Sequence, residues 1–250
     1  MTSLRGKKAL VVGAGAGVGK ATVTALAREG VLVTAIARGA EGLEALRKEV
    51  PEGLTTVRAD ASDPATASRL LGELRPELVV LAGGVRPQMG PVDELDWDTF
   101  SEAWNNDMKS TFFFTKAALT VPLAPGSNVV FLSSGAAVAG SHYSGGYAGA
   151  KRMQWLLAGY AQQRSETKNL GIRFLAVVPR QLIEGTAIGE KASSTYGGLS
   201  GKTGAEYMKR FEVPLDSDKV AAAVLKGLRG EVDKGVIAVA VSGTGIEPLA

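Results

Sequence analysis

The chain alternates short apolar runs rich in β-branched residues with longer segments of helical period. The apolar runs predict seven strands, at Lys8–Val12, Val31–Ala35, Leu54–Arg58, Leu78–Leu81, Asn128–Leu132, Ile172–Val178 and Val236–Val241. The segments between them predict helices near 18–29, 41–49, 64–74, 96–120, 146–166 and 217–229. Nearly continuous apolar strands separated by helices are typical of a parallel sheet that is covered on both faces. We therefore predict an α/β fold with a doubly wound, seven-stranded parallel sheet.

These elements use the whole of residues 1–250, so a single domain is expected. The stretch 183–214 stands apart, because its periodicity is weaker and it is rich in Gly, Ser and Thr. A long irregular insertion in a compact fold often serves as a lid or a binding loop. We predict a substrate loop or lid there.

Composition restricts the classes of function. With 45% hydrophobic and 21% charged residues, the chain has the balance of a globular protein with a sizeable core. Its apolar runs fall short of the roughly 20 residues that span a bilayer, and its N-terminus lacks a signal-peptide core. With no cysteine and one histidine, no disulfide and no metal site are predicted. The absence of cysteine fits a cytoplasmic protein, and no membrane partner is expected. The net charge of +3 includes no dense basic tract, so we expect no nucleic-acid partner.

A glycine-rich turn follows the first predicted strand and begins the first helix. It reads Gly13-x-x-x-Gly17-x-Gly19, and Val18 stands where G-x-G-x-x-G would need its third glycine. Glycines allow a tight turn that brings backbone N–H groups against a pyrophosphate at the positive end of a helix. The turn therefore predicts a dinucleotide site, although a purely structural link between strand and helix would use the same residues.

The end of the second strand bears on cofactor choice. NAD sites commonly place an acidic residue here, which binds the ribose 2′-hydroxyl, whereas NADP sites favour a nearby arginine. This chain has the small Ala37 followed by Arg38, with no acid. The pattern favours NADP(H) over NAD(H); a solvated arginine at a helix start is the alternative.

Candidate catalytic residues lie around the fifth strand and the helix that follows it. Tyr147 and Lys151 are four residues apart, which places both side chains on one helical face. A free phenol titrates near pH 10, and a neighbouring ammonium favours the phenolate, which makes the phenol a better proton donor and acceptor. Ser134 ends the fifth strand, at the edge where parallel sheets build ligand sites. It can hydrogen-bond a substrate oxygen, or it can simply cap a turn.

Together these residues resemble the short-chain dehydrogenase/reductase family, whose fold is of the Rossmann type. The likeness covers essentially the whole chain: the glycine turn from Val12 to Gly19, Asp60 beside the adenine, Ser134, and the Tyr147-x-x-x-Lys151 motif. The resemblance implies that Lys151 also binds the nicotinamide ribose. It places the cofactor against Gly13, Gly17, Val18, Gly19, Arg38, Asp60, Ala61, Ala82, Gly83, Gly84, Tyr147, Lys151, Pro179 and Thr186.

The chain departs from the family pattern in four places. Val12 replaces a threonine, Leu81-Ala82-Gly83-Gly84 replaces N-N-A-G, and Pro179-Arg180 replaces P-G. The family's relay asparagine on the fourth helix corresponds to Asp107, with Asn105 and Asn106 adjacent. Which of these three residues takes that place is left open, because an aspartate would add negative charge near Lys151.

The expected function is hydride exchange between NADP(H) and a small-molecule carbonyl or alcohol. Related enzymes are dimers or tetramers, so we expect a homodimer or homotetramer, with Trp155 and Tyr160 at a subunit interface. A non-catalytic dinucleotide-binding regulator is the alternative. Hydrolysis by a serine nucleophile fits less well, because the chain lacks a G-x-S-x-G elbow and a histidine partner.

Overall fold

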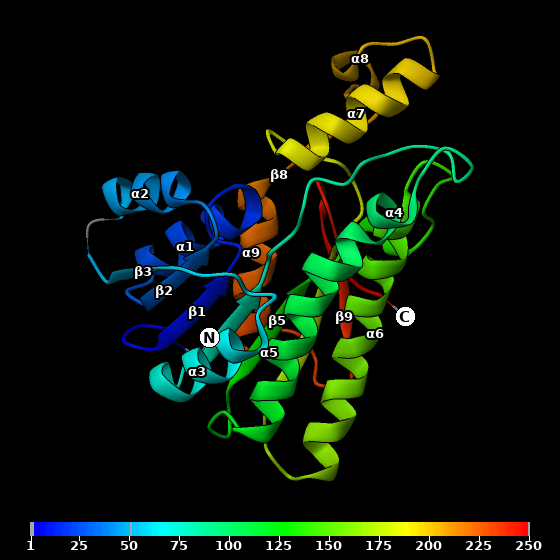
Figure 1. Cartoon of the computed structure of the whole chain (residues 1–250). Coiled ribbons are helices and arrows are strands. Elements are labelled where there is room, and N and C mark those ends of the chain that lie inside the picture. Colours follow the sequence, from blue (N-terminus) through cyan, green and yellow to red (C-terminus); the bar gives the residue numbers. More distant parts are fainter. Residues whose placement is uncertain (1–2, 51, 250) are drawn as a thin grey trace.

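An eight-stranded sheet forms the centre of the computed structural model, which describes residues 3–50 and 52–249 (Figure 1). The strand order is β10-β9-β6-β5-β4-β1-β2-β3, and every neighbouring pair is parallel except β10 with β9. The strands of this sheet are β1 (Lys8–Val12), β2 (Leu32–Ala37), β3 (Leu54–Arg58), β4 (Leu78–Leu81), β5 (Asn128–Leu132), β6 (Arg173–Pro179), β9 (Ala238–Ser242) and β10 (Gly245–Leu249).

Helices cover both faces of this sheet. One layer holds α1 (Gly17–Arg28), α2 (Ala40–Glu49) and α9 (Ser217–Leu228), and the other holds α3 (Pro64–Leu74), α5 (Lys109–Thr120) and α6 (Gly145–Thr167). Each layer closes its own apolar core, with Leu26 and Val224 under the first and Phe114 and Phe174 under the second. In the part of the chain that the structure describes, no helix combines the length and apolarity needed to cross a membrane.

The predicted doubly wound α/β fold is confirmed, and the sheet has one strand more than the seven predicted. The extra strand, β10, adds to the edge of the sheet by pairing antiparallel with β9. Its residues Gly245–Leu249 are mostly exposed and include Pro248. An edge strand with one exposed face and a proline lacks the apolar run by which buried strands are recognised.

The predicted helix at 96–120 is continuous but changes its winding. It begins as α4 (Trp97–Ala103), passes through one π-helical turn, η1 (Trp104–Met108), and continues as α5. Single π turns inside α-helices are frequent at functional sites. Here the π turn carries Asp107, which lies almost wholly buried.

The stretch 183–214 is folded, so the expectation of an irregular segment is wrong. It contains β7 (Ile183–Glu184), α7 (Ala187–Leu199) and α8 (Gly204–Met208), and β7 pairs with β8 (Leu215–Asp216). The buried positions of α7 recur at helical spacing but hold Gly189, Ala192, Ser193 and Gly197. These small residues allow α7 to pack closely on α8. Because they are not strongly hydrophobic, the sequence shows no clear apolar periodicity over this helix. Figure 1 shows the pair projecting from the body of the domain.

Candidate active site

A cavity of about 480 Å³ opens at the carboxyl ends of the parallel strands. It includes the point between β1 and β4 where the strand order reverses, the usual position of ligands in open α/β sheets. All the residues predicted to bind cofactor or to catalyse line this one cavity: Gly13, Gly17, Val18, Gly19, Arg38, Asp60, Ala61, Ala82, Gly83, Gly84, Ser134, Tyr147, Lys151, Pro179 and Thr186. The fold therefore brings together in space the cofactor-binding and catalytic positions named from the sequence.

The glycine turn is shaped by close backbone contacts. Gly13 has a φ of +81°, and a Cβ there would collide with the backbone of Gly83. A Cβ on Gly19 would collide with the carbonyl oxygen of Gly13. The N-cap of α1 is Ala16, so no side chain caps the helix, and its first turn contains no acidic residue. The first amides of α1 are thus open to an anionic ligand.

Arg38 lines the cavity directly after the end of β2. The Arg38 guanidinium donates a hydrogen bond to Asn106 Oδ1 at 2.9 Å. Asp60 accepts hydrogen bonds from the N–H and hydroxyl of Ser62, and these bonds, together with the charge of Arg38, hold the pKa of the Asp60 carboxyl below its ordinary value. Arg58 donates to the Arg38 carbonyl at 3.0 Å, which places a second cation beside Arg38.

Tyr147 and Lys151 lie one turn apart on α6, with the Lys151 Nζ 5.5 Å from the centre of the Tyr147 ring. The Ser133 hydroxyl donates to the Lys151 carbonyl oxygen at 2.8 Å, which ties this turn of the helix to the end of β5. The Lys151 side chain is only 4% exposed. An ammonium buried to this degree needs a compensating charge.

Asp107 supplies that charge. Its Oδ2 lies 3.1 Å from Lys151 Nζ, without hydrogen-bond alignment, and its Oδ1 accepts a hydrogen bond from the Val85 N–H at 2.8 Å. Burial alone lowers the pKa of the Lys151 ammonium, but the Asp107 carboxylate and Tyr147 outweigh it, so this pKa lies above its ordinary value. Asn106 faces Arg38, and Asn105 donates to Ser101. Of the three adjacent residues, Asp107 is therefore the one beside the lysine.

Ser134, Thr186 and Pro179 combine structural contacts with positions on the cavity wall. Ser134 Oγ accepts a hydrogen bond from the Ala136 N–H at 3.3 Å and caps the short helix η2 (Gly135–Ala137). Ser134 also lines the cavity, so it both caps this turn and faces the site. Thr186 caps α7, and its hydroxyl donates to the Ile183 carbonyl oxygen. Pro179 ends β6 beside Val241.

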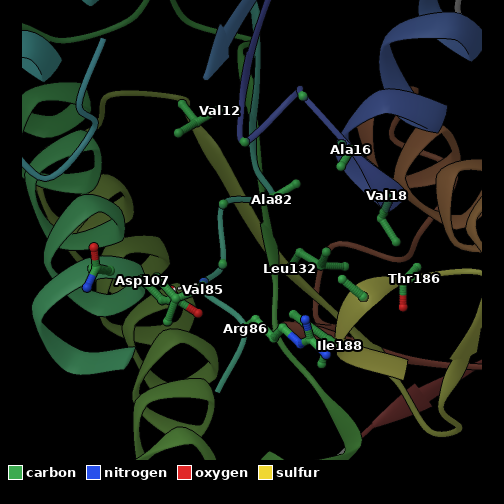
Figure 2. Close-up of a pocket in the computed structure, with 18 of the residues that line it drawn as sticks. Val12, Ala16, Val18, Ala82, Val85, Arg86, Asp107, Leu132, Thr186 and Ile188 are labelled. Carbon is green, nitrogen blue, oxygen red and sulfur yellow. Dashed lines mark hydrogen bonds between the residues drawn. The ribbon is translucent and has the colours of Figure 1, made fainter. Parts of the chain in front are cut away.

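Sequence reasoning missed part of the lining. Arg86, Leu132 and Ile188 line the cavity together with Gln181 and Leu182. Arg86 belongs to the loop after β4 and Ile188 to the first turn of α7, and Figure 2 labels both among the lining residues. These residues follow no motif, because different parts of the chain bring them to the wall: the loop after β4, the end of β5, the segment after β6 and the start of α7. His142 is exposed and packs edge-on against Tyr143, outside the cavity lining. Within residues 3–50 and 52–249, no cluster of His, Asp or Glu has the makings of a metal site.

The sequence profile of the short chain dehydrogenases matches residues 7–196. The chain belongs to this family. The match begins just before β1 and continues through the glycine turn, Ser134, Tyr147 and Lys151 into α7. A structural comparison agrees on the family fold, because the crystal structure of levodione reductase superposes with a TM-score of 0.84 at 22% identity, covering 96% of this chain and 97% of that one.

Several relatives in the family are named reductases. L-xylulose reductase of Mesocricetus auratus is 31% identical over 107 residues, which are 43% of this chain and 43% of the relative. Carbonyl reductase [NADPH] 2 of Sus scrofa is 33% identical over 107 residues, which are again 43% of this chain and 43% of the relative. Glycine betaine reductase ATRR of Emericella nidulans is 30% identical over 250 residues, 90% of this chain but 18% of the relative. The matches thus span less than half of each of these three relatives.

Proposed function

We propose that this chain is an NADP(H)-dependent oxidoreductase that transfers a hydride between nicotinamide and a small-molecule carbonyl or alcohol. One observation carries the proposal: Ser134, Tyr147 and Lys151 line the same cavity as the glycine turn. A proton donor and a dinucleotide site within one enclosure are what carbonyl reduction needs. The named reductases among the relatives support the same class of reaction.

The described residues fit a dinucleotide. The uncapped amides of α1 would hold the pyrophosphate, and the contact between Gly13 and Gly83 leaves the turn free of side chains that would block it. Lys151 would also reach the nicotinamide ribose. The cofactor supplies or accepts the hydride, while the protein positions it and handles the proton.

The preference for NADP(H) rests on Arg38. No acidic residue ends β2 or directly follows it, and Arg38 lies on the cavity wall with Arg58 hydrogen-bonded to its carbonyl oxygen. A guanidinium can bind the 2′-phosphate by charge-assisted hydrogen bonds. The carbonyl reductase of Sus scrofa is named for NADPH, which supports the same choice.

Proton transfer falls to Tyr147. Its hydroxyl would donate a proton to the carbonyl oxygen during reduction and remove one from the alcohol during oxidation. The Lys151 ammonium stays charged at working pH, because its pKa is raised above the ordinary value. Its positive charge favours the phenolate that forms when Tyr147 gives up its proton. Ser134 would hydrogen-bond the same substrate oxygen.

Two further features belong to this proposal. The pair α7 and α8 would act as a lid, because Thr186, which caps α7, and Ile188 of its first turn line the cavity. The helices α5 and α6 would form a homodimer or homotetramer interface, since Phe112 is 46% and Tyr160 is 57% exposed.

The deciding experiment is Tyr147→Phe, tested with ketones and alcohols that the unaltered protein converts with NADPH or NADP⁺. The ring stays and only the proton donor is lost, so turnover should fall a hundredfold or more, since positioned acid–base groups contribute about 10²–10⁴-fold. NADPH binding should remain nearly unchanged. Lys151→Ala should impair both turnover and cofactor binding. Normal turnover by Tyr147→Phe would remove Tyr147 from the mechanism, and the absence of any converted substrate would favour the non-catalytic regulator.

A further inference from the structure

Arg86 occupies a restrained position on the cavity wall. The preceding residue, Val85, is 8% exposed and donates its N–H to Asp107 Oδ1 at 2.8 Å. The following residue is the buried Pro87, and a residue before proline is confined to extended backbone. The backbone on both sides is therefore fixed, while the Arg86 side chain is exposed and lines the cavity (Figure 2).

This position is close to the proposed reaction centre. A Cβ built on Gly84 would lie 3.3 Å from Asp107 Oδ2, 3.6 Å from Lys151 Nζ and 3.8 Å from Ile188 Cδ1. Arg86 is two residues further on, so its Cα is at most about 7 Å from that of Gly84. The backbone of Arg86 therefore lies near the end of the cavity that holds Asp107 and Lys151.

The charges of the cavity leave Arg86 without a counterion. The charged side chains that line it are Arg38, Asp60, Arg86, Asp107 and Lys151. Lys151 is paired with Asp107, and the charge of Arg38 acts on Asp60. Arg86 takes part in no ion pair of residues 3–50 and 52–249. The substrate end thus carries a surplus positive charge.

The surroundings of Arg86 favour the binding of an anionic group of the substrate. The cavity that Arg86 lines is also lined by the apolar side chains of Val85, Leu132 and Ile188. An apolar wall offers a substrate anion few other polar partners, so the planar guanidinium fork is its natural contact. Arginine binds carboxylate and phosphate groups through two parallel hydrogen bonds.

We propose that the substrate carries an anionic oxygen group, a carboxylate or a phosphate, that binds Arg86 while the carbonyl carbon faces the nicotinamide. The proposal rests on the oxidoreductase function proposed above and narrows its substrate class to anionic carbonyl compounds and the corresponding alcohols. Arg86 is then the residue that determines specificity, whereas Tyr147 handles the proton.

The test uses matched pairs of ketones, a keto acid with its amide and a keto phosphate ester with its free alcohol. The unaltered protein should reduce the anionic member of at least one pair with a kcat/KM roughly 10-fold or more higher, the effect of a charge-assisted hydrogen bond. Arg86→Gln should abolish that preference, mainly through KM, and Arg86→Lys should retain part of it. The preference should also shrink as added salt screens the exposed guanidinium.

A matched control is Arg180→Gln, which removes the same charge from an exposed arginine that does not line the cavity. It should leave the preference intact, and an equal loss there would overturn the assignment to Arg86.

Equal reduction of anionic and neutral ketones by the unaltered protein would also overturn the assignment, while leaving the oxidoreductase function standing. If no ketone is reduced, the proposed function fails instead. The anion site is then tested separately, by titrating the protein–NADPH complex with analogues of the keto acid and keto phosphate that lack the carbonyl group. Loss of binding in Arg86→Gln supports the anion site, and unchanged binding refutes it.

Discussion

The buried pair of Asp107 and Lys151 makes a quantitative prediction about stability. The side chains are 1% and 4% exposed, and the charged atoms lie 3.1 Å apart. Asp107→Asn is nearly isosteric and can still accept the hydrogen bond from the Val85 N–H. The change therefore removes the negative charge and little else, which leaves a buried ammonium without its counterion.

The size of the effect follows from the geometry. At 3.1 Å, two unit charges attract by about 5 kcal/mol with an effective dielectric constant of about 20. Removing one partner of a buried pair typically costs about 3–5 kcal/mol, because the remaining charge is uncompensated. We expect a loss of about 3 kcal/mol in the free energy of unfolding near pH 6, since the asparagine oxygen still offers the ammonium a dipole.

The pH dependence distinguishes a charge effect from a packing effect. In the unaltered protein the pKa of Lys151 is raised above 10.5, so the stability contributed by this shift is fully present below pH 10.5 and is lost as pH rises through the still higher folded-state pKa. In Asp107→Asn, burial is no longer opposed by the carboxylate, so the folded-state pKa of Lys151 should fall below its unfolded value. The unfolded chain then binds more protons between these two values, and the stability of the variant rises with pH there. The deficit should therefore be largest near pH 6 and shrink toward pH 10.

Urea unfolding of the cofactor-free protein, followed by far-ultraviolet circular dichroism at several pH values, measures this deficit. Asp60→Asn is the matched control, because it makes the same change on an exposed carboxylate of the same cavity. Its deficit should stay within about 1 kcal/mol and should not vary over this range. The double variant Asp107→Asn/Lys151→Met should recover stability relative to Asp107→Asn, because no buried charge remains. A deficit that is equal at pH 6 and pH 10 would refute the ion-pair reasoning.

Three further predictions concern cofactor, lid and assembly. Arg38→Ala should weaken NADPH binding roughly 10-fold and leave NADH binding unchanged; equal affinity of the unaltered protein for both cofactors would contradict the choice of NADP(H). Hydrogen exchange in α7 and α8 should be fast in the free protein and slow in a ternary complex, and strong protection in both states would indicate a rigid insertion instead. Tyr160→Glu, at a position 57% exposed on α6, should reduce the mass measured by light scattering; a monomeric unaltered protein would refute the interface.

The local pattern of the chain determined most of the fold. Strands β1, β3, β4 and β5 lie at the residues predicted for them. β1, β4 and β5 are short, mostly buried apolar runs, whereas the partly exposed β3 is rich in β-branched residues. The helices that pack on the sheet were predicted within about two residues, since each presents one apolar stripe to it. The missed elements lack such a signal. They are the exposed edge strand β10, helix α7, whose buried positions hold small residues, helix α8, which has no buried residue, and the two-residue strands β7 and β8.

In the candidate site, too, local motifs could be predicted from the sequence, whereas contacts between distant residues could not. The glycine turn, Ser134, Tyr147 and Lys151 could be named from the sequence, because their spacing is set within one strand–turn–helix unit or by one helical turn. The choice among Asn105, Asn106 and Asp107 could not, since it depends on how the π turn directs each side chain. The contact of Asp107 with Lys151 joins residues on two helices, and one cavity wall combines Arg86 of the loop after β4 with Ile188 of α7. Such pairings depend on how packed elements place distant residues, so only the tertiary structure decided them.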